Sequence, residues 1–596
     1  MRNSNLRGLS EAMSVPRKAL RGLALLSAMA FTFCSATITS AQTPPPVLFF
    51  SDLDSGPNSG GENVGGFAGV YVTLYGNNFG TTQGTSTVTW NGQNCLRVVP
   101  ATGNYSGWGS PYLWYQKTVV QIGSTCTPGA GNFVVTTPNG ASNGMPFTVR
   151  STGRIYFAST TGNDNTGTGS FASPWASIRK GVDSLTAGDT VYAMNGLNQT
   201  GTGAYSDVMD WSAQGTAGNP VALVAYPGAT ASVTATSTDH AIRCAAGYTT
   251  SLCQYSTIAG MKLLNVNGTF TLSIQYNNAN NWRIIANDIS CPHENGQDGC
   301  FHASQGGPWY FYGNYIHDMS TLNAGSTSSK QSHSVYFTTD ANHVWVGWNK
   351  WYNNYTCRDL QFHSSPTGGG DGQNQYDLHV HDNFFDGQRC NAINFATIDP
   401  SKGPVEAYNN LIINVGRGPA SNDGDSEAYA AIYSPNITNT GSPGSGTFQI
   451  YNNTFWNTST SNPFGTTGIL ETQGSNMTMN AVNNVVYAPS GVAYISKGGG
   501  GIITGSNNLW FGNGTSPSGL TGNINLDPLF VNASNKDFHL QALSLAIGAG
   551  SITTVPTRDN DGLIRPVPPS IGAYEYFSGT VVQRPNPPTN LLVSVQ

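Results

Sequence analysis

Charged side chains are scarce in this 596-residue chain. Only 9% of its residues are Asp, Glu, Lys or Arg, with 25 basic side chains against 31 acidic ones, where a typical globular chain has roughly 25%. So few Lys and Arg residues cannot build the basic surface that binding to nucleic acid needs, so no nucleic-acid partner is expected. The 72 glycines imply many turns and disfavour coiled coils and helical bundles.

Long apolar runs are also missing. The run from Leu23 to Phe33 follows a basic segment at 17–21 and precedes the small residues Ser40 and Ala41. It is shorter than the ~20 residues of a membrane-spanning helix, and this order of features is typical of a secretory signal. We therefore expect a signal peptide at residues 1–41, no membrane span, and a secreted protein that is extracellular or periplasmic.

The cysteines agree with export. No CxxC pair is present, so a zinc site is disfavoured, and an oxidising compartment makes disulfides the expected state. Eight cysteines follow the signal, and they fall into near neighbours along the chain: Cys95 with Cys126, Cys244 with Cys253, Cys291 with Cys300, and Cys357 with Cys390.

Residues 43–150 have the pattern of short strands and turns. Apolar and polar residues alternate, as in Val70 to Tyr75, and Gly and Asn interrupt the runs. The run from Gly69 to Gly80 and the ending Val134 to Gly140 resemble the IPT/TIG family of immunoglobulin-like sandwiches. That resemblance implies a spacer or binding platform without catalysis.

A repeat follows in the larger part of the chain. An Asn followed by mostly apolar residues recurs every 24 to 43 residues, with short β-like runs before and after it, at Asn287, Asn314, Asn349, Asn383, Asn410, Asn453, Asn484 and Asn508. Units of this length stack into solenoids. Two strands around one Asn per turn predict a parallel β-helix, because stacked Asn side chains can hydrogen-bond from coil to coil at a tight bend.

Both ends of this region carry a family resemblance. The segments Arg154 to Phe157 and Gly188 to Tyr192, and the close Ile571 to Tyr576, resemble secreted proteins of the pectate-lyase-like superfamily. The predicted fold class is therefore all-β, a right-handed parallel β-helix (solenoid) over 153–577, preceded by the Ig-like β-sandwich. Residues 578–596 are expected to be a linker and a truncated fibronectin-III-like start.

The resemblance implies a substrate groove on the strands that follow each Asn bend and loop. We place these strands at 300–305, 333–339, 358–365, 391–398 and 429–435. Alternation predicts a central outward row of substrate-binding residues, with Asp359 in a flanking outward row: His302, Tyr336, Gln361, Asn394 and Tyr433. The flanking row with Asp359 would also hold Cys300, Ser334, Ala392 and Ala431, and the row on the other side Ser304, Thr338, His363 and Ala396.

Basic groups gather around the same strands. The candidate catalytic residues are Lys330, His333, Arg358, His363 and Arg389. A base, a cation for the substrate carboxylate and an acid for the leaving oxygen are what β-elimination of a uronic-acid polymer needs. The first expectation is therefore an enzyme, a polysaccharide lyase, that acts as a monomer on a polysaccharide.

Three further possibilities stay open. A glycoside hydrolase would need paired carboxylates, for which Asp359 with Asp298 or Glu294 could serve. A non-catalytic extracellular polysaccharide-binding or adhesive protein would use the β-helix as a rigid rod. No cofactor is certain, but the acidic stretch 422–427 could hold calcium. For His379 and His381, stacking over Trp345 is expected rather than metal binding.

Overall fold

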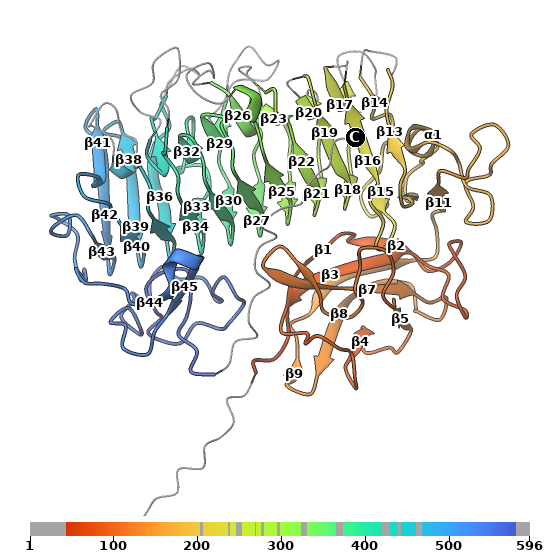
Figure 1. The fold of residues 1–596 in the computed structure, drawn as a ribbon, viewed down its shortest axis with the longest axis horizontal. Coiled ribbons are helices and arrows are strands. Elements are labelled where there is room, and N and C mark those ends of the chain that lie inside the picture. The colour runs from red at the N-terminus through yellow and green to blue at the C-terminus, as the bar shows by residue number, and fades with distance from the viewer. Residues whose placement is uncertain are drawn as a thin grey trace, which may run out of the picture. The chain divides into compact units, whose positions relative to one another are not determined.

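The computed structural model is all-β apart from one short helix and two 3₁₀ turns in its described residues, and most strands belong to three long parallel sheets (Figure 1). The expected signal peptide and residues 580–596 lie outside the described residues, which are 43–202, 207–236, 239–245, 253–268, 270–275, 279–294, 299–323, 331–364, 374–418, 429–437, 443–459 and 468–579.

The first part of the chain forms one antiparallel sheet and one mixed sheet, packed around a common core. One sheet contains β1 (Val47–Ser51), β3 (Tyr71–Asn77), β7 (Tyr115–Ile122), β5 (Leu96–Val98) and β6 (Ser110–Tyr112). The other contains β2 (Ser55–Pro57), β10 (Met145–Arg150), β8 (Gly129–Thr137), β4 (Thr87–Trp90) and β9 (Gly140–Ala141). This is an Ig-like β-sandwich, built from alternating residues whose apolar members, such as Val72, Leu74 and Val120, are buried.

A right-handed parallel β-helix follows, and each coil contributes one strand to each of three sheets. Sheet I contains β11 (Ile155–Ala158), β12 (Thr190–Ala193), β15 (Val221–Ala225), β18 (Ser256–Ala259), β21 (Trp282–Ile285), β24 (Trp309–Tyr312), β27 (Val344–Gly347), β30 (Leu378–His381), β33 (Val405–Tyr408), β36 (Gly446–Tyr451), β39 (Met477–Val482) and β42 (Ile502–Ser506).

Sheet II contains β13 (Asn198–Gln199), β16 (Ser232–Ala235), β19 (Lys262–Asn265), β22 (Asp288–Ser290), β25 (Tyr315–His317), β28 (Lys350–Tyr352), β31 (Phe384–Asp386), β34 (Leu411–Ile413), β37 (Thr454–Trp456), β40 (Val485–Tyr487) and β43 (Leu509–Phe511). Sheet III contains β14 (Met209–Asp210), β17 (His240–Ala245), β20 (Phe270–Gln275), β23 (Gly299–Ser304), β26 (His333–Thr338), β29 (Arg358–His363), β32 (Asn391–Phe395), β35 (Ile432–Ser434), β38 (Gly468–Gln473) and β41 (Ala493–Gly498).

An asparagine ladder forms the bend between sheets I and II. Asn349 shows the pattern: its Nδ2 donates to Asn383 Oδ1 at 3.0 Å, and its Oδ1 accepts from Asn314 Nδ2 at 3.0 Å. The same bonds link all eight predicted asparagines, from Asn287 to Asn508. The predicted repeat is confirmed, because a buried amide is stable only when the coils above and below satisfy its polar atoms.

The interior of the coil is apolar and its first edge is covered. Phe337, Phe362 and Phe395 follow one another in register along sheet III inside the core, and Phe301 packs on Phe337 with ring centroids 5.5 Å apart. At the start of the solenoid lies α1 (Ile178–Asp183), whose N-cap Ser177 accepts from Lys180 N at 3.1 Å. Helix α1 contacts β11, β12 and β13, so it covers the open end of the first coils.

The sandwich packs against sheets I and II. The Tyr192 hydroxyl of β12 donates to Tyr71 O at 2.8 Å, and Arg283 Nη2 of β21 donates to Ser51 O at 2.7 Å. Trp114 meets Phe384 of β31 edge to face at 6.0 Å. These contacts are all remote from the outer face of sheet III, so the sandwich does not occupy the face predicted to bind substrate.

A C-terminal segment also packs on the outside of the β-helix. It contains β44 (Phe530–Asn532), η3 (Ala533–Asn535) and β45 (Asp537–Leu540). Phe530 meets Trp456 of sheet II at 5.6 Å, and Arg565 Nη2 donates to Asn409 Oδ1 at 2.8 Å beside the Asn ladder. Another 3₁₀ turn, η1 (Thr321–Asn323), leaves sheet II. No helix among the described residues is long and apolar enough to cross a membrane.

The disulfides follow three of the four expected pairs: Cys95–Cys126, Cys244–Cys253 and Cys357–Cys390. The expectation for Cys291 and Cys300 is corrected, because both are buried thiols here. Cys300 Sγ lies 2.8 Å from Thr271 Oγ1, and Cys291 Sγ donates to Gly268 O at 3.5 Å. Burial and then the neighbouring Cys300 thiol raise the pKa of Cys291 well above its usual value, which keeps this sulfur protonated.

Candidate functional site

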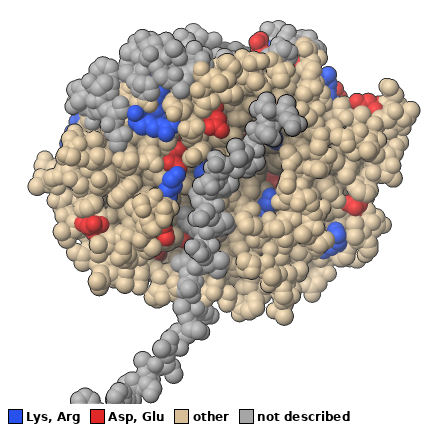
Figure 2. All heavy atoms as spheres, in the orientation of Figure 1, with Lys and Arg blue, Asp and Glu red and all other residues tan. Residues whose placement is uncertain are grey.

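The outer face of sheet III carries four of the ten histidines in the chain: His240, His302, His333 and His363. They come from β17, β23, β26 and β29. Strand register places them in three adjacent outward rows. Charged side chains are sparse on the surface of this protein, as Figure 2 shows for one face, so four histidines on one sheet face are a candidate site.

The predicted central row is present in the structure. Its register runs from Asp210 through Arg243, Ser273, His302, Tyr336, Gln361, Asn394, Tyr433 and Glu471 to Ser496. His302 and Tyr336 are each 7% exposed, and Asn394 and Tyr433 are 1% exposed. The row therefore lies in a largely desolvated environment, in which electrostatic interactions are stronger than in water.

Aromatic and imidazole rings stack along these rows. The His302 and Tyr336 rings lie 5.4 Å apart with an interplanar angle of 10°, and His333 stacks on Tyr336 at 4.5 Å. Gly299 makes this packing possible, because a Cβ there would lie 2.9 Å from Tyr336 Cβ. At the other end of the stack, Phe270 lies between His240 at 4.5 Å and His302 at 6.0 Å.

Hydrogen bonds orient the polar atoms of this face. The Tyr336 hydroxyl lies 2.8 Å from His363 Nδ1, and Gln275 Nε2 lies 2.7 Å from His302 Nδ1. One coil further, Asn394 Nδ2 donates to Gln361 Oε1 at 2.9 Å. The Tyr336–His363 pair joins a phenol to an imidazole, which is an arrangement through which a proton can move.

Burial keeps two of the imidazoles neutral. Burial and then His240 lower the pKa of His302 to about 3, and burial and then the charge of Arg358 lower the pKa of His363 to about 4. Both rings are therefore uncharged proton acceptors near neutral pH. Farther along the central row, burial raises the pKa of Glu471 to about 7.

The prediction that Asp359 lies in an outward flanking row is wrong. Backbone N–H groups of Cys357 and Arg358 both donate to Ser332 O at 3.1 Å, so β29 is irregular at its start. The irregularity turns His333 outward onto Tyr336, whereas Ser334 and Asp359 face the interior. Ser334 Oγ donates to Asp359 Oδ1 at 2.8 Å, and Asn354 Nδ2 donates to the same oxygen at 2.7 Å.

The other residues predicted in this outward row also face inward, because Cys300, Ala392 and Ala431 belong to the apolar core. The inward position changes the chemistry of Asp359. Asp359 is 1% exposed, and burial raises its pKa to about 8. It is a buried structural carboxyl and does not lie on the outer face of sheet III.

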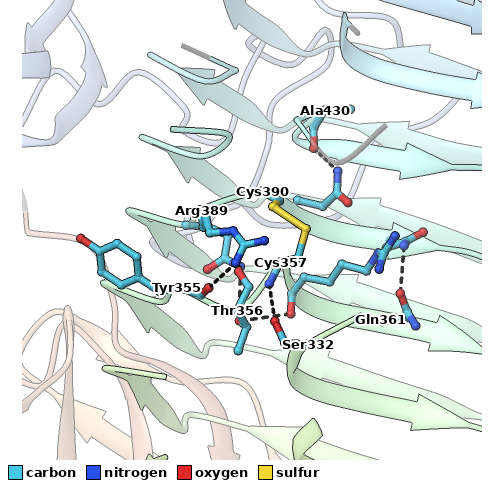
Figure 3. Close-up of a disulfide and its surroundings, with 12 residues drawn as sticks. Ser332, Tyr355, Thr356, Cys357, Gln361, Arg389, Cys390 and Ala430 are labelled. Carbon is cyan, nitrogen blue, oxygen red and sulfur yellow. Dashed lines mark hydrogen bonds between the residues drawn. A yellow bond between two sulfur atoms is a disulfide. The ribbon is translucent and has the colours of Figure 1, made fainter. Parts of the chain in front are cut away.

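Arg389 also differs from its expected position. It is fully buried, and its Nη1 donates to Tyr355 O at 3.3 Å. Figure 3 shows Arg389 beside Tyr355, on the other side of the Cys357–Cys390 disulfide from Gln361 of the central row. Arg389 therefore lies at the turn between sheets II and III and not on the outer face of sheet III. Lys330, the remaining catalytic candidate, lies outside the described residues.

The residues expected to hold calcium, and part of the carboxylate pair expected for a hydrolase, lie outside the described residues. The stretch 422–427 and Asp298 lie outside them, and Glu294 is completely buried. Across the described ranges, no group of three His, Cys, Asp or Glu side chains is placed to hold a metal ion. His379 stacks on Trp345 at 5.1 Å, as expected, but the expectation for His381 is wrong, because His381 stacks on Tyr408 at 5.2 Å.

Sequence reasoning missed the first coils of the site, including His240, Phe270 and Gln275. The Asn ladder begins only at Asn287, so these coils carry no marker for alignment. It also missed Glu471, although the alternation in 468–473 could have placed it on the row.

No protein-family model and no curated protein matches this chain. Among solved structures, pectate lyase Pel9A is similar at 12% identity, covering 71% of this chain and 96% of its own, with a TM-score of 0.45. A rhamnogalacturonan lyase is similar at 14% identity over 72% of this chain and 96% of its own, with a TM-score of 0.35. XylC in complex with xylose is similar at 9% identity over 71% and 99%, with a TM-score of 0.40.

Proposed function

We propose that this chain is a secreted polysaccharide lyase that cleaves a uronic-acid polymer by β-elimination on the outer face of sheet III. The observation that carries the proposal is the 2.8 Å contact between the Tyr336 hydroxyl and His363 Nδ1, next to Arg358. A neutral imidazole, a phenol and a guanidinium supply a proton acceptor, a proton donor and a cation, which together meet the needs of this reaction.

The elimination can be written with these groups. Arg358 binds the carboxylate of the uronosyl unit, which makes the neighbouring ring C–H more acidic. The Tyr336 oxygen takes that proton while its own hydroxyl proton passes to His363. The carbon–oxygen bond of the glycosidic link then breaks, a carbon–carbon double bond forms, and the leaving oxygen receives a proton from Tyr336, which His363 replaces. One proton is removed and one is delivered, so the pair returns to its starting state.

The carboxyl groups of the central row support a lyase over a two-carboxylate hydrolase. Asp210 and Glu471 are the carboxyls of the central row in the part of the chain that the structure describes. Eight strand spacings of about 4.8 Å separate them, or about 38 Å. Paired catalytic carboxylates lie within roughly 5–9.5 Å.

The three disulfides fit an oxidising compartment and therefore export. A polysaccharide is the proposed partner because an extended row of polar and aromatic side chains offers many contacts along a chain of sugars. The protein is proposed to act as a monomer.

The test is a panel of anionic and neutral polysaccharides incubated with the mature protein. Near-ultraviolet absorbance reports the unsaturated uronate, and a reducing-end assay runs in parallel. Absorbance and reducing ends that rise together on an anionic polymer are expected. Reducing ends without absorbance would replace the lyase with a hydrolase, and neither signal on any polymer would favour the adhesive protein.

A further inference from the structure

A hollow in the protein surface lies far from the outer face of sheet III. It has a volume of about 410 Å³ and forms where β1 of the sandwich, the outer face of sheet I and the segment 555–562 meet. A volume of this size is within the range of small-molecule sites, which occur preferentially between domains. None of the residues that line it belongs to the proposed lyase site.

The hollow has two aromatic walls. His381, Tyr408 and Tyr451 stack along sheet I, with centroids 5.2 Å and 5.0 Å apart and interplanar angles of 11° and 19°. Phe49 of the sandwich stacks on Trp348 at 5.6 Å and 15°. The Trp348 ring is at 89° to His381, so the two sets of rings meet nearly at a right angle.

Hydrogen-bond donors and acceptors lie beside the rings. The Tyr408 hydroxyl has no hydrogen-bond partner within the described ranges. Arg558 uses one N–H on Gly562 O at 2.7 Å, and no carboxylate of the described residues lies within salt-bridge distance of it. Asp382 accepts from Asn409 Nδ2 at 3.0 Å and contacts His381 Nδ1 at 2.9 Å, which fixes its carboxylate in the wall.

We propose that this hollow binds a neutral pyranose, as one or two sugar units of a polysaccharide. The C–H faces of a pyranose ring match aromatic walls, and its hydroxyl groups both donate and accept hydrogen bonds. Arg558 and Asp382 provide a donor and an acceptor of opposite charge, which suits an uncharged polyhydroxylated ligand better than an anion. The site would hold the protein on a polysaccharide independently of the reaction on sheet III.

The test is isothermal titration calorimetry of the full protein with neutral monosaccharides and disaccharides, namely glucose, galactose, xylose and cellobiose. Millimolar binding of at least one sugar is expected. Trp348→Ala should weaken it at least 10-fold, and Tyr408→Phe, which removes one hydroxyl and retains the ring, about 2- to 10-fold.

The matched control is Trp345→Ala. Trp345 lies in β27, three residues before Trp348, and stacks on Tyr310 and His379 outside the hollow, so this variant should bind the sugar as the wild type does. His363→Gln should also retain binding, which separates this site from the lyase site. The proposal is overturned if no neutral sugar binds, if Trp348→Ala and Tyr408→Phe bind with unchanged affinity, or if only His363→Gln abolishes binding.

Discussion

The outer faces of sheets I and III both carry stacked histidines, but the histidines on the two faces have different hydrogen-bond partners. On sheet I, His379 lies 2.6 Å from Glu406 and 2.9 Å from Asp377, and these carboxylates raise its pKa despite its burial. On sheet III, His302 and His363 contact an amide and a phenol, and burial lowers their pKa values.

Stacking alone therefore does not mark a catalytic histidine. A carboxylate partner converts a stacked imidazole into one half of a structural ion pair, whereas a neutral partner leaves it able to accept a proton. Within sheet III, His240 also has a carboxylate neighbour, because its Nδ1 lies 2.8 Å from Asp207 Oδ1 at the edge of the face. The following predictions test whether this distinction separates catalysis from structure.

The largest effect is expected for His363→Gln. The variant keeps a polar side chain beside Tyr336 but loses the proton acceptor, so kcat should fall about 10²- to 10⁴-fold. Steady-state rates of unsaturated-uronate formation measure it. His379→Gln is the matched control on sheet I and should retain wild-type kcat, and equal losses in both variants would contradict the comparison.

Arg358→Met should have the next largest effect. Loss of a charge-assisted bond to the substrate carboxylate is expected to lower kcat/KM about 10- to 150-fold. Rates on an anionic polymer measure the effect, and Arg154→Met on an exposed arginine serves as the control. An unchanged kcat/KM would remove Arg358 from carboxylate binding.

The two faces should respond oppositely to pH in stability. The folded pKa of His379 is raised, so its contribution is present below the unfolded value of about 6.5 and is lost as pH rises through the folded value. His379→Gln should therefore lower Tm more at pH 5.5 than at pH 9, by an amount equivalent to about 1–2 kcal/mol.

His302→Gln should show the reverse trend. The folded pKa of His302 is lowered to about 3, so its contribution is present above about 6.5 and is lost as pH falls toward 3. Tm differences from wild type, measured by calorimetry between pH 4 and 9, should shrink on acidification for His302→Gln. Parallel curves for both variants would show that the two histidines share one environment.

The smallest effect concerns the acid limb of the pH–rate profile. Because the pKa of His363 is lowered to about 4, kcat/KM should persist well below pH 6.5 and fall only toward pH 4. The charge of Arg358 contributes to this lowering, so the limb of Arg358→Met should move upward. A wild-type limb at pH 6.5 would show that His363 is not the group that titrates.

Much of the scaffold could be predicted from residue order. The recurring asparagines, from Asn287 to Asn508, and the alternation that places Phe337 inside and Tyr336 outside follow from local spacing alone. The irregular start of β29 could not be predicted, because it depends on Ser332 O meeting two N–H groups of the next coil. At this irregularity Asp359 faces inward and His333 stacks outward on Tyr336. Nor does residue order show that Arg389 lies beneath a turn.

Local spacing is enough to predict the winding of the chain and the residues that share its central row, since both depend on a short period repeated along the chain. Local spacing cannot predict which histidines are neutral, because the pKa of an imidazole depends on burial and on partners from other coils, such as Arg358 for His363 and Glu406 for His379. The hollow between Phe49, Tyr408 and Arg558 likewise exists only because three distant segments meet there.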